Sequence, residues 1–187
     1  MSIILLRGFS HSGKDYIGHI LCKNYGFTRF AFADSLKKIV ADKFGCAISQ
    51  LHSQEGKLLI CENDEKKRTY RQILIDEALR LRNLDSDIFV KHCCNDIISE
   101  DARNIVITDW RYPNELDLIK SKLYKYKVFP VHVVRTKQDR SPVDDISEYH
   151  LNDRTTDWVL HNNVDDSIFS EIEKLIKFIE PKNEVGL

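Results

Sequence analysis

The sequence predicts an α/β fold of three layers, in which helices cover both faces of a central parallel sheet. Two observations support this. Short apolar runs alternate along the chain with segments whose apolar residues recur every three or four positions. In addition, a glycine-containing loop stands between the first apolar run and the first helical segment, an arrangement typical of anion sites on parallel sheets. The strands are expected at 3–7, 28–32, 104–109, 128–134 and 157–160.

The loop runs from Gly8 to Asp15 and reads Gly-Phe-Ser-His-Ser-Gly-Lys-Asp. Its spacing is that of a phosphate-binding loop, GxxxxGK followed by Ser or Thr. In such a loop, backbone N–H groups turn toward the phosphates, the helix N-terminus adds partial positive charge, and Lys14 would supply a full one. Asp15 stands where a hydroxyl normally ligates Mg²⁺, so a carboxylate takes that position. A glycine loop that binds nothing is the alternative at this point.

Length and composition indicate one domain with an ordinary core. The chain has 187 residues, of which 42% are apolar and 30% are charged. The 28 basic and 29 acidic side chains nearly cancel, so no overall charge favours a nucleic acid polymer or a membrane surface. No apolar run approaches about 20 residues, and the five cysteines form no CxxC pair. We therefore expect a cytoplasmic protein with reduced thiols, no membrane span and no secretion signal.

The second informative stretch is an apolar strand that ends in Asp109 and continues as Trp-Arg-Tyr-Pro-Asn-Glu. An aspartate at the carboxyl end of a central strand lies beside the phosphate-binding loop and can hold Mg²⁺ or its waters. Arg111 follows and is a candidate for a bidentate phosphate contact. Pro113 suits the first turn of the next helix. Alone, a strand ending in Asp is a weak signal; together with the loop it indicates a nucleotide site.

The region between these two stretches carries helices and basic residues. Asp34 or Ser35 is expected to cap a helix that ends at Gly45. Residues 46–66 are polar and irregular, and we expect a mobile segment there. Further helical stripes are expected from 70 to 81 and from 89 to 98.

Two arginines at the start of the first of these stripes are candidates for an anion clamp. Arg68 and Arg71 are three residues apart, so on a helix they would share a face and could hold one phosphate together. The alternative is that both are solvated or ion-paired.

The fourth strand is followed by a charged segment, 135–150, which includes Arg135 and Arg140. Such an excursion could close over phosphates as a lid, and a solvated loop is the alternative. The last strand leads through a turn at Asn162 into a helix that ends before Pro181.

These motifs together resemble the deoxynucleoside monophosphate (dNMP) kinases of large viruses and phages. The resemblance spans most of the chain in order, and its residues are Gly13–Asp15, Phe30–Asp34, Lys37, Arg68, Arg71, Ile107–Glu115, Ser147–Glu148 and Asn162. Its most specific part is 107–115, which matches Ile-Thr-Asp-x-Arg-(Phe or Tyr)-Pro-Asn-Glu. The family's loop also carries Asp after the lysine, although it often has basic residues where Ser10 and His11 stand. Phosphomevalonate kinases of the animal type share the Gly-Lys-Asp loop.

The resemblance implies a P-loop kinase fold of the nucleoside monophosphate kinase type and the reaction ATP + dNMP → ADP + dNDP. A single kinase domain would span 1–187, with an acceptor-binding helical insertion at 33–100 and a short lid at 135–150. The implied cofactors are ATP and Mg²⁺, the metal lying near Asp15 and Asp109. The implied ATP-binding residues are Gly8, Ser10, His11, Ser12, Gly13, Lys14, Asp15 and Asn162.

The resemblance also implies a set of acceptor-binding residues: Phe30, Phe32, Asp34, Lys37, Arg68, Arg71, Asp109, Trp110, Arg111, Asn114, Glu115 and Glu148. Those acting on the transferring phosphoryl group would be Lys14, Asp15, Arg111, Arg135 and Arg140. Phe30 or Phe32 would stack on the acceptor base, or both would belong to the core.

The expected partners are ATP and a dNMP, without a nucleic acid polymer or a membrane; a homodimer is left open. The location would be the host cytoplasm if the source is a virus. A phosphomevalonate-kinase-like enzyme and a nucleotide-binding switch without an acceptor are the alternatives, and the switch would leave Arg68, Arg71 and Arg111 without a role.

Overall fold

The computed structural model describes residues 1–135, 151, 156–163 and 165–180. Contacts divide the chain into two compact units, one made of Met1–Ala31 with Ile97–Leu187 and the other of Phe32–Asp96. The second unit has nearly the bounds of the predicted 33–100 insertion, whose role in binding an acceptor stays a prediction. The predicted site residues Arg140 and Glu148, and all of the predicted lid except Arg135, lie outside the described residues.

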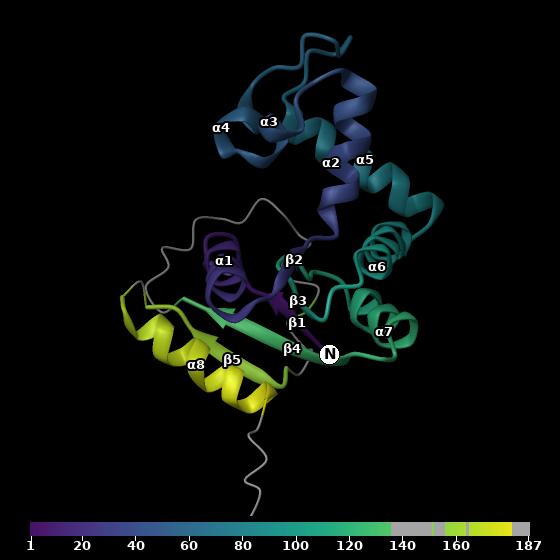
Figure 1. Ribbon diagram of the computed structural model, residues 1–187. Helices are drawn as coiled ribbons and strands as arrows, with labels where there is room; N and C mark the ends of the chain where they lie inside the picture. Colours follow the sequence, from purple (N-terminus) through teal and green to yellow (C-terminus); the bar gives the residue numbers. More distant parts are fainter. Residues whose placement is uncertain (136–150, 152–155, 164, 181–187) are drawn as a thin grey trace, which may run out of the picture. The chain divides into compact units, whose positions relative to one another are not determined.

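The first unit is built on a five-stranded sheet in the order β2-β3-β1-β4-β5 (Figure 1). Its strands are β1 (Ser2–Arg7), β2 (Thr28–Phe30), β3 (Asn104–Ile107), β4 (Lys127–Val134) and β5 (Trp158–His161). All four pairings are parallel, which confirms the predicted α/β class with a central parallel sheet. Because β1 has a neighbour on each side and helices above and below, all six of its residues are buried.

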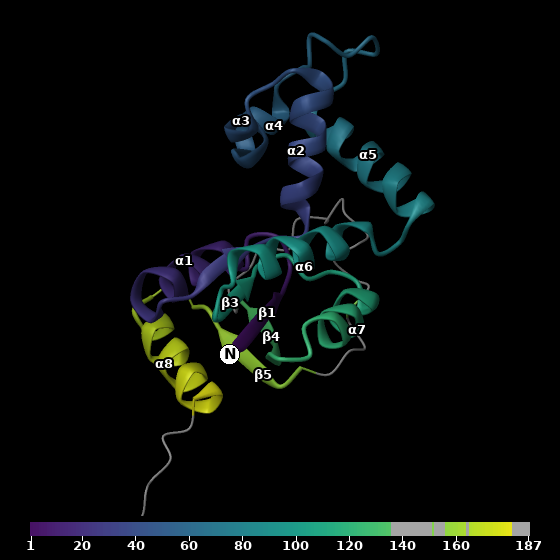
Figure 2. The same cartoon turned by 45° about the vertical axis from the view of Figure 1, so that its right-hand side comes forward.

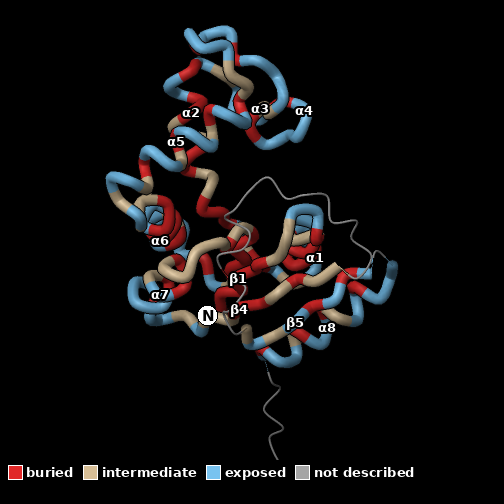
Figure 3. The backbone as a smooth tube through the Cα atoms, turned by 180° about the vertical axis from the view of Figure 1, so that it is seen from behind, coloured by how far each residue is buried: buried red, intermediate tan, exposed pale blue. Residues whose placement is uncertain are grey.

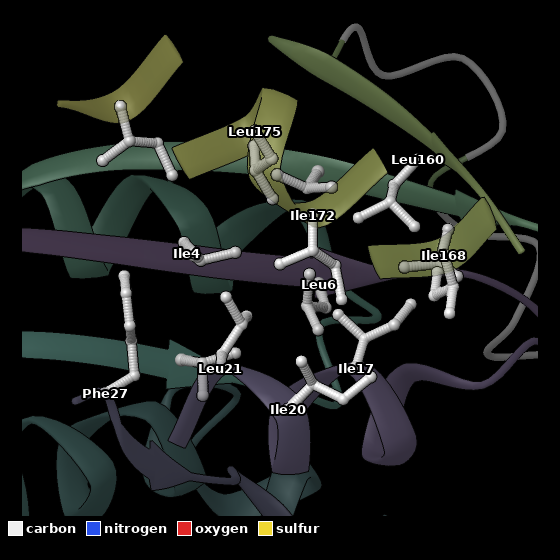
Figure 4. Packing of buried hydrophobic residues seen from close by; sticks show 14 residues of the cluster. Ile4, Leu6, Ile17, Ile20, Leu21, Phe27, Leu160, Ile168, Ile172 and Leu175 are labelled. Atoms are coloured by element: carbon white, nitrogen blue, oxygen red, sulfur yellow. The ribbon is translucent and has the colours of Figure 1, made fainter. Parts of the chain in front are cut away.

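Helices lie on both faces of this sheet (Figure 2). The helices α1 (Lys14–Tyr25) and α8 (Ser167–Ile179) cover one face, and α7 (Pro113–Lys122) lies on the other. On the face below α1 and α8, Ile4 and Leu6 of β1 pack with Leu21 of α1 and with Ile172 and Leu175 of α8 (Figure 4). Each such side chain, fully buried, contributes about 1.5–3 kcal/mol relative to exposure. The glycine loop therefore follows directly after a strand whose six residues are all buried.

The second unit is helical. It consists of α2 (Ala33–Phe44), α3 (Ile48–His52), α4 (Gln54–Leu58), α5 (Tyr70–Leu84) and most of α6 (Ile88–Glu100), whose last turn belongs to the first unit. The helix α2 begins at Ala33, so the predicted caps Asp34 and Ser35 lie inside its first turn.

The expectation of an irregular segment at 46–66 is wrong for its first part, which forms α3 and α4; residues 61–66 belong to no helix or strand, and the predicted mobility stays a prediction. Five-residue helices are too short to show a periodic apolar pattern. They are set by local features instead: the Ser53 side chain accepts a hydrogen bond from the Gly56 amide. At Gly56 a Cβ atom would lie only 2.2 Å from the Gln50 carbonyl oxygen.

In the first unit, the buried residues concentrate on the strands of the sheet and on the helix faces that pack against it. The tube in Figure 3 shows β1 as buried, β4 as partly buried and the outer faces of the helices as exposed. Among the helices in the described ranges, none has both the length and the apolar character needed to cross a membrane.

Candidate functional site

The loop between β1 and α1 lies against the carboxyl ends of the neighbouring strands. Gly8 and Gly13 have φ angles of 151° and 97°, values that only glycine adopts without strain. A Cβ atom at Gly8 would lie 2.5 Å from the Val133 carbonyl oxygen, and one at Gly13 would lie 2.2 Å from the Asn162 side-chain nitrogen. Both glycines are therefore required by close approach as well as by backbone angle.

Lys14, the first residue of α1, folds back over the loop. Its ammonium group donates to the carbonyl oxygens of Gly8 at 2.6 Å and Phe9 at 2.8 Å, and it lies 3.5 Å from the Ser12 hydroxyl. A full positive charge thus stands inside the loop at a helix N-terminus, where the helix dipole also favours an anion.

Two side chains from adjacent strand ends hold the outside of the loop. Arg135, which follows β4, donates from Nη1 to the His11 carbonyl at 2.8 Å. Asn162, which follows β5 and is buried, donates from Nδ2 to the Ser12 carbonyl at 2.9 Å. Because C=O and the following N–H point in opposite directions in a trans peptide, this bond turns the Gly13 amide away from Asn162. Asn162 and Arg135 therefore contact the loop itself; the ATP contact of Asn162 and the action of Arg135 on the transferring phosphoryl group stay predictions.

The elements that carry Asp15 and Asp109, α1 and β3, are neighbours, and the predicted shared metal site stays a prediction. Beyond β3 the chain continues beside β1, since the Trp110 amide donates to the Leu6 carbonyl at 3.1 Å. Asp109 lies just before Trp110, in the segment that connects β3 to α7. The helix α1 approaches closely there, because a Cβ at Gly18 would lie 2.7 Å from the Thr108 methyl carbon. Asp15 is three residues before Gly18 and so lies on the same face of α1.

This arrangement fits a magnesium site of the kind found in nucleotide enzymes. Within the described ranges, no three or more His, Cys, Asp or Glu side chains gather as a metal site. Mg²⁺ with a nucleotide needs no such group, because it is held by one or two carboxylates, phosphate oxygens and waters. Asp15 and Asp109 are suited to that role.

The stretch that carries Arg111 is held by a buried carboxylate. Glu115 is 3% exposed and accepts from the backbone amides of Arg111 at 2.9 Å and Tyr112 at 3.1 Å, which caps α7. Trp110 is 2% exposed, and its indole donates to the Tyr112 carbonyl at 2.9 Å. Glu115 and Trp110 thus fix the turn that presents Arg111, whereas the sequence analysis placed both against the substrate. Asn114 lies in the first turn of α7 and is half-buried.

The predicted aromatic platform for a base is buried. Phe30 is 7% exposed and Phe32 is 2% exposed, which is the core alternative left open by the sequence. Rings buried to this degree offer no face on which a base could stack in this conformation.

The predicted arginine clamp of the second unit is not formed. Arg68 precedes α5, which begins at Tyr70, so Arg68 and Arg71 do not share a helix face. Arg68 binds Asp64 at 2.7 Å and Asp76 at 2.6 Å. Its hydrogen bonds lower the pKa of Asp64 to about 2, and those of both carboxylates raise the pKa of Arg68. Arg71 donates to the neutral side chain of Gln54 at 2.8 Å.

A second pair of predicted acceptor residues is also joined within this unit. The ammonium group of Lys37 lies 3.2 Å from a carboxylate oxygen of Asp34 and 3.2 Å from Nδ1 of His52.

Comparisons with known proteins give the fold. No protein-family model and no curated protein matches the sequence. Among solved structures, TT1252 from Thermus thermophilus is similar over 94% of this chain and 95% of its own, at 16% identity and a TM-score of 0.52. This similarity agrees with two features described above, the order of the strands and the glycine loop that follows β1. At 16% identity the likeness shows the fold, a central parallel sheet of five strands with helices on both faces. The predicted fold class is thereby confirmed.

Two weaker likenesses have TM-scores below 0.5. Shikimate kinase from Aquifex aeolicus gives a TM-score of 0.49 at 16% identity, with 98% of this chain and 99% of that chain covered. The APS kinase CysC of Mycobacterium tuberculosis, in complex with AMPPNP and APS, gives 0.45 at 12% identity over 95% and 96%. At these TM-scores and identities neither likeness assigns a fold or a substrate to this chain.

The sequence analysis missed one charged residue next to the P-loop. Arg7, the last residue of β1, is buried; its Nη1 donates to the Leu151 carbonyl, and its Nη2 lies 3.4 Å from Nδ1 of His132. Burial lowers the pKa of His132 to about 4, helped by the positive charges of Arg7 and Lys14 and by His161. The sequence feature that could have identified Arg7 is a charged residue at the end of an apolar strand, directly before Gly8.

Proposed function

We propose that this protein is an ATP-dependent kinase that converts deoxynucleoside monophosphates into diphosphates. The single observation that carries the kinase assignment is the P-loop with Lys14 folded inside it, on the carboxyl edge of a parallel sheet. The choice of acceptor rests on the resemblance of 107–115 to the dNMP kinases. The proposed partners are therefore ATP and a dNMP, both small molecules.

On the donor side, the residues of the loop would bind the β- and γ-phosphates. The Lys14 ammonium would exchange the neutral carbonyls of Gly8 and Phe9 for phosphate oxygens, which are better acceptors for a cation. Asp15 and Asp109 would hold Mg²⁺, which neutralises charge between the phosphates when bound. Asn162 would keep the Ser12 carbonyl turned outward, so that the Gly13 amide is free to donate.

On the acceptor side, Arg111 would hold the monophosphate. Its backbone is fixed by Glu115, so the guanidinium fork is offered to the phosphate from a rigid turn. Arg135 would exchange the His11 carbonyl for the transferring group, and Arg140 would assist it. In the second unit, Arg71 is the better candidate for a phosphate contact, because its partner Gln54 is neutral.

A substrate screen tests this function. The four dNMPs, the corresponding ribonucleotides and phosphomevalonate are each incubated with ATP and Mg²⁺, and ADP release is followed. We expect dNMP turnover about ten- to a hundredfold above ribonucleotide turnover, the effect of burying one hydroxyl without a partner.

Each other outcome of the screen replaces the proposal with a defined alternative. Equal rates with deoxy and ribo acceptors indicate a general nucleoside monophosphate kinase. Turnover of phosphomevalonate alone indicates an enzyme similar to the phosphomevalonate kinases. ATP binding without turnover of any acceptor indicates a nucleotide-binding switch. Where Lys14 is replaced, Lys23→Ala, at an exposed position in the last turn of α1, is the control for non-specific damage by the substitution.

A further inference from the structure

Thr108 carries a buried hydroxyl at the carboxyl end of β3. The residue directly follows the strand, and its amide donates to the Phe30 carbonyl at 3.3 Å, so its main chain continues the pairing of β3 with β2. Thr108 is 2% exposed. Within the part of the chain that the structure describes, its Oγ1 atom has no hydrogen-bond partner. A buried hydroxyl without a partner destabilises the folded protein, and valine, which has the same shape, would avoid this effect.

The Thr108 side chain points to the sheet face that α1 covers. Side chains alternate along a strand, so residue 108 shares the face of Val106. Val106 belongs to the same buried cluster as Ile17 and Leu21 of α1. A Cβ atom at Gly18 would lie 2.7 Å from the Thr108 methyl carbon, which places this methyl directly against the helix. The hydroxyl is bonded to the same Cβ atom of Thr108 and therefore lies under the N-terminal half of α1.

Gly18 is a second unfavourable choice at this contact. Glycine within a helix is less stable than alanine, because its backbone loses more freedom on folding. Here the missing Cβ atom lets α1 approach the end of β3 at Thr108. Two residues in contact thus lower the local stability where the first turns of α1 cover the strand end. Departures of this kind from the most stable residue are typical of functional sites.

The residues near Thr108 are those proposed to hold the metal. Asp109 is its neighbour in the sequence, and Asp15 lies on the same face of α1 as Gly18, one turn closer to the P-loop. In the usual P-loop pattern a Ser or Thr follows the lysine, and its hydroxyl ligates Mg²⁺. In this chain Asp15 occupies that position, and a buried hydroxyl stands instead at the end of β3.

We propose that Thr108 is a positioning residue of the metal site, whose hydroxyl accepts a hydrogen bond from a water held by Mg²⁺ when the Mg²⁺–nucleotide complex binds. Mg²⁺ keeps several of its waters in nucleotide sites, and a fixed acceptor for one of them orients the ion. Because Oγ1 is closed to solvent here, this bond forms only as the loop rearranges around the phosphates. The inference rests on the proposed function for the binding of Mg²⁺–ATP and does not depend on the acceptor.

Two substitutions separate the hydroxyl from the shape of the side chain. Thr108→Val keeps the shape and removes the hydroxyl, whereas Thr108→Ser keeps the hydroxyl and removes the methyl group. Without nucleotide, we expect the Tm of Thr108→Val to equal or exceed that of the original protein. The Tm of Thr108→Ser should be lower, because the methyl that packs against Gly18 is lost. Thr28→Val, at a half-buried position on β2, is the matched control and should leave nucleotide binding unchanged.

Nucleotide binding should give the opposite order. Isothermal titration calorimetry measures the Kd for a non-hydrolysable ATP analogue, once with Mg²⁺ and once with EDTA. We expect Thr108→Val to raise the Kd with Mg²⁺ about three- to tenfold, the effect of one lost hydrogen bond, and to leave the Kd with EDTA within about twofold. Thr108→Ser should bind the analogue with Mg²⁺ within about twofold of the original protein. A variant that is at least as stable but binds the metal complex less well is not expected from a structural role.

Three results would overturn the inference. Thr108→Val with a lowered Tm and an unchanged Kd would show that the hydroxyl has a partner within the fold, such as a buried water, and is structural. An equal rise of the Kd with Mg²⁺ and with EDTA would show that the hydroxyl serves the loop or the phosphates and not the metal. Thr108→Ser that binds as weakly as Thr108→Val would show that the hydroxyl is not the cause.

Failure of the proposed function gives a different result. If the original protein does not bind the analogue in either condition, the proposed function fails, and the inference fails with it. If the original protein binds the analogue with Mg²⁺ but turns over no dNMP, only the acceptor is wrong, and the comparison of Thr108→Val with Thr108→Ser still decides the role of the hydroxyl.

Discussion

The P-loop and the start of α5 both hold basic side chains, but they bind them to different kinds of acceptor. At the loop, Lys14 and Arg135 donate to main-chain carbonyls. Before α5, Arg68 is bound by the carboxylates of Asp64 and Asp76. A phosphate that replaces a carbonyl gains a charge interaction, whereas one that replaces a carboxylate must first break an ion pair. The comparison supports the proposal that the loop binds an anionic ligand, whereas the ion pairs of Arg68 lie within the second unit.

Replacing Lys14 is the strongest test of the first half of this comparison. Lys14→Ala should lower kcat about a hundred- to a thousandfold, because the group that stabilises developing negative charge is lost. Steady-state kinetics with ATP and the best dNMP give the value. Circular dichroism should show the fold intact, since Lys14 is half-buried and is not part of the hydrophobic core. Turnover above about a tenth of the original would remove the P-loop assignment.

The arginines test the contrast directly. Arg111→Lys should lower kcat/KM for the monophosphate about ten- to a hundredfold, almost as much as Arg111→Ala, because an ammonium cannot reproduce a planar fork. The affinity for ATP should stay nearly unchanged. The same substitution at Arg68 should leave kcat/KM within about threefold and lower Tm instead.

A control and a counter-result accompany this pair of substitutions. Arg103→Lys, at an exposed position before β3, should change neither quantity. If Arg68→Lys harms monophosphate use as much as Arg111→Lys does, Arg68 leaves its carboxylates during the reaction, and the comparison is broken.

The sequence predicted the parts of the site that are set by short-range patterns. The strand, the loop spacing and Asp109 follow from residues close together in the chain, and the fold places them as expected. Trp110 and Glu115 are buried, and their predicted contact with the substrate stays a prediction, because a motif shows which residues are required and not whether they face a ligand or the interior.

Other features depend on contacts that no local pattern reports. Arg7 donates a hydrogen bond to the Leu151 carbonyl, 144 residues away in the sequence. Arg68 lies before the start of α5 and forms ion pairs with Asp64 and Asp76. The helices α3 and α4 were missed because five residues carry too little periodicity. Burial of Phe30 and Phe32 was left undecided, since aromatic residues suit both a core and a base-stacking platform.

A pH titration sharpens the description of the loop's surroundings. The pKa of His132 is about 4 in the folded protein and about 6.5 when unfolded. Between these values the unfolded chain binds a proton that the folded protein does not, so His132 supports stability above pH 6.5 and loses that support as pH falls toward 4. Urea unfolding at pH 7.0, 5.5 and 4.5 should therefore show a steeper decline for the original protein than for His132→Gln. Parallel curves would mean that burial, with the charges of Arg7, Lys14 and His161, does not keep the ring neutral.

The smallest expected effect concerns the carboxylate that holds Arg68. Hydrogen bonds from Arg68 keep the pKa of Asp64 at about 2, below its usual 3.8, so the ion pair is intact above pH 4 and is lost as pH falls through 2. Tm measured from pH 5 to pH 2 should fall in this window by a few degrees more in the original protein than in Asp64→Asn, in which residue 64 cannot titrate. Arg68→Met should abolish the same difference, because the carboxylate then loses the donor that lowers its pKa. Asp42→Asn, exposed on α2, controls for general charge. An unchanged difference in Arg68→Met would show that Arg68 is not engaged by Asp64 in solution, and the contrast between Arg68 and the loop would then be lost.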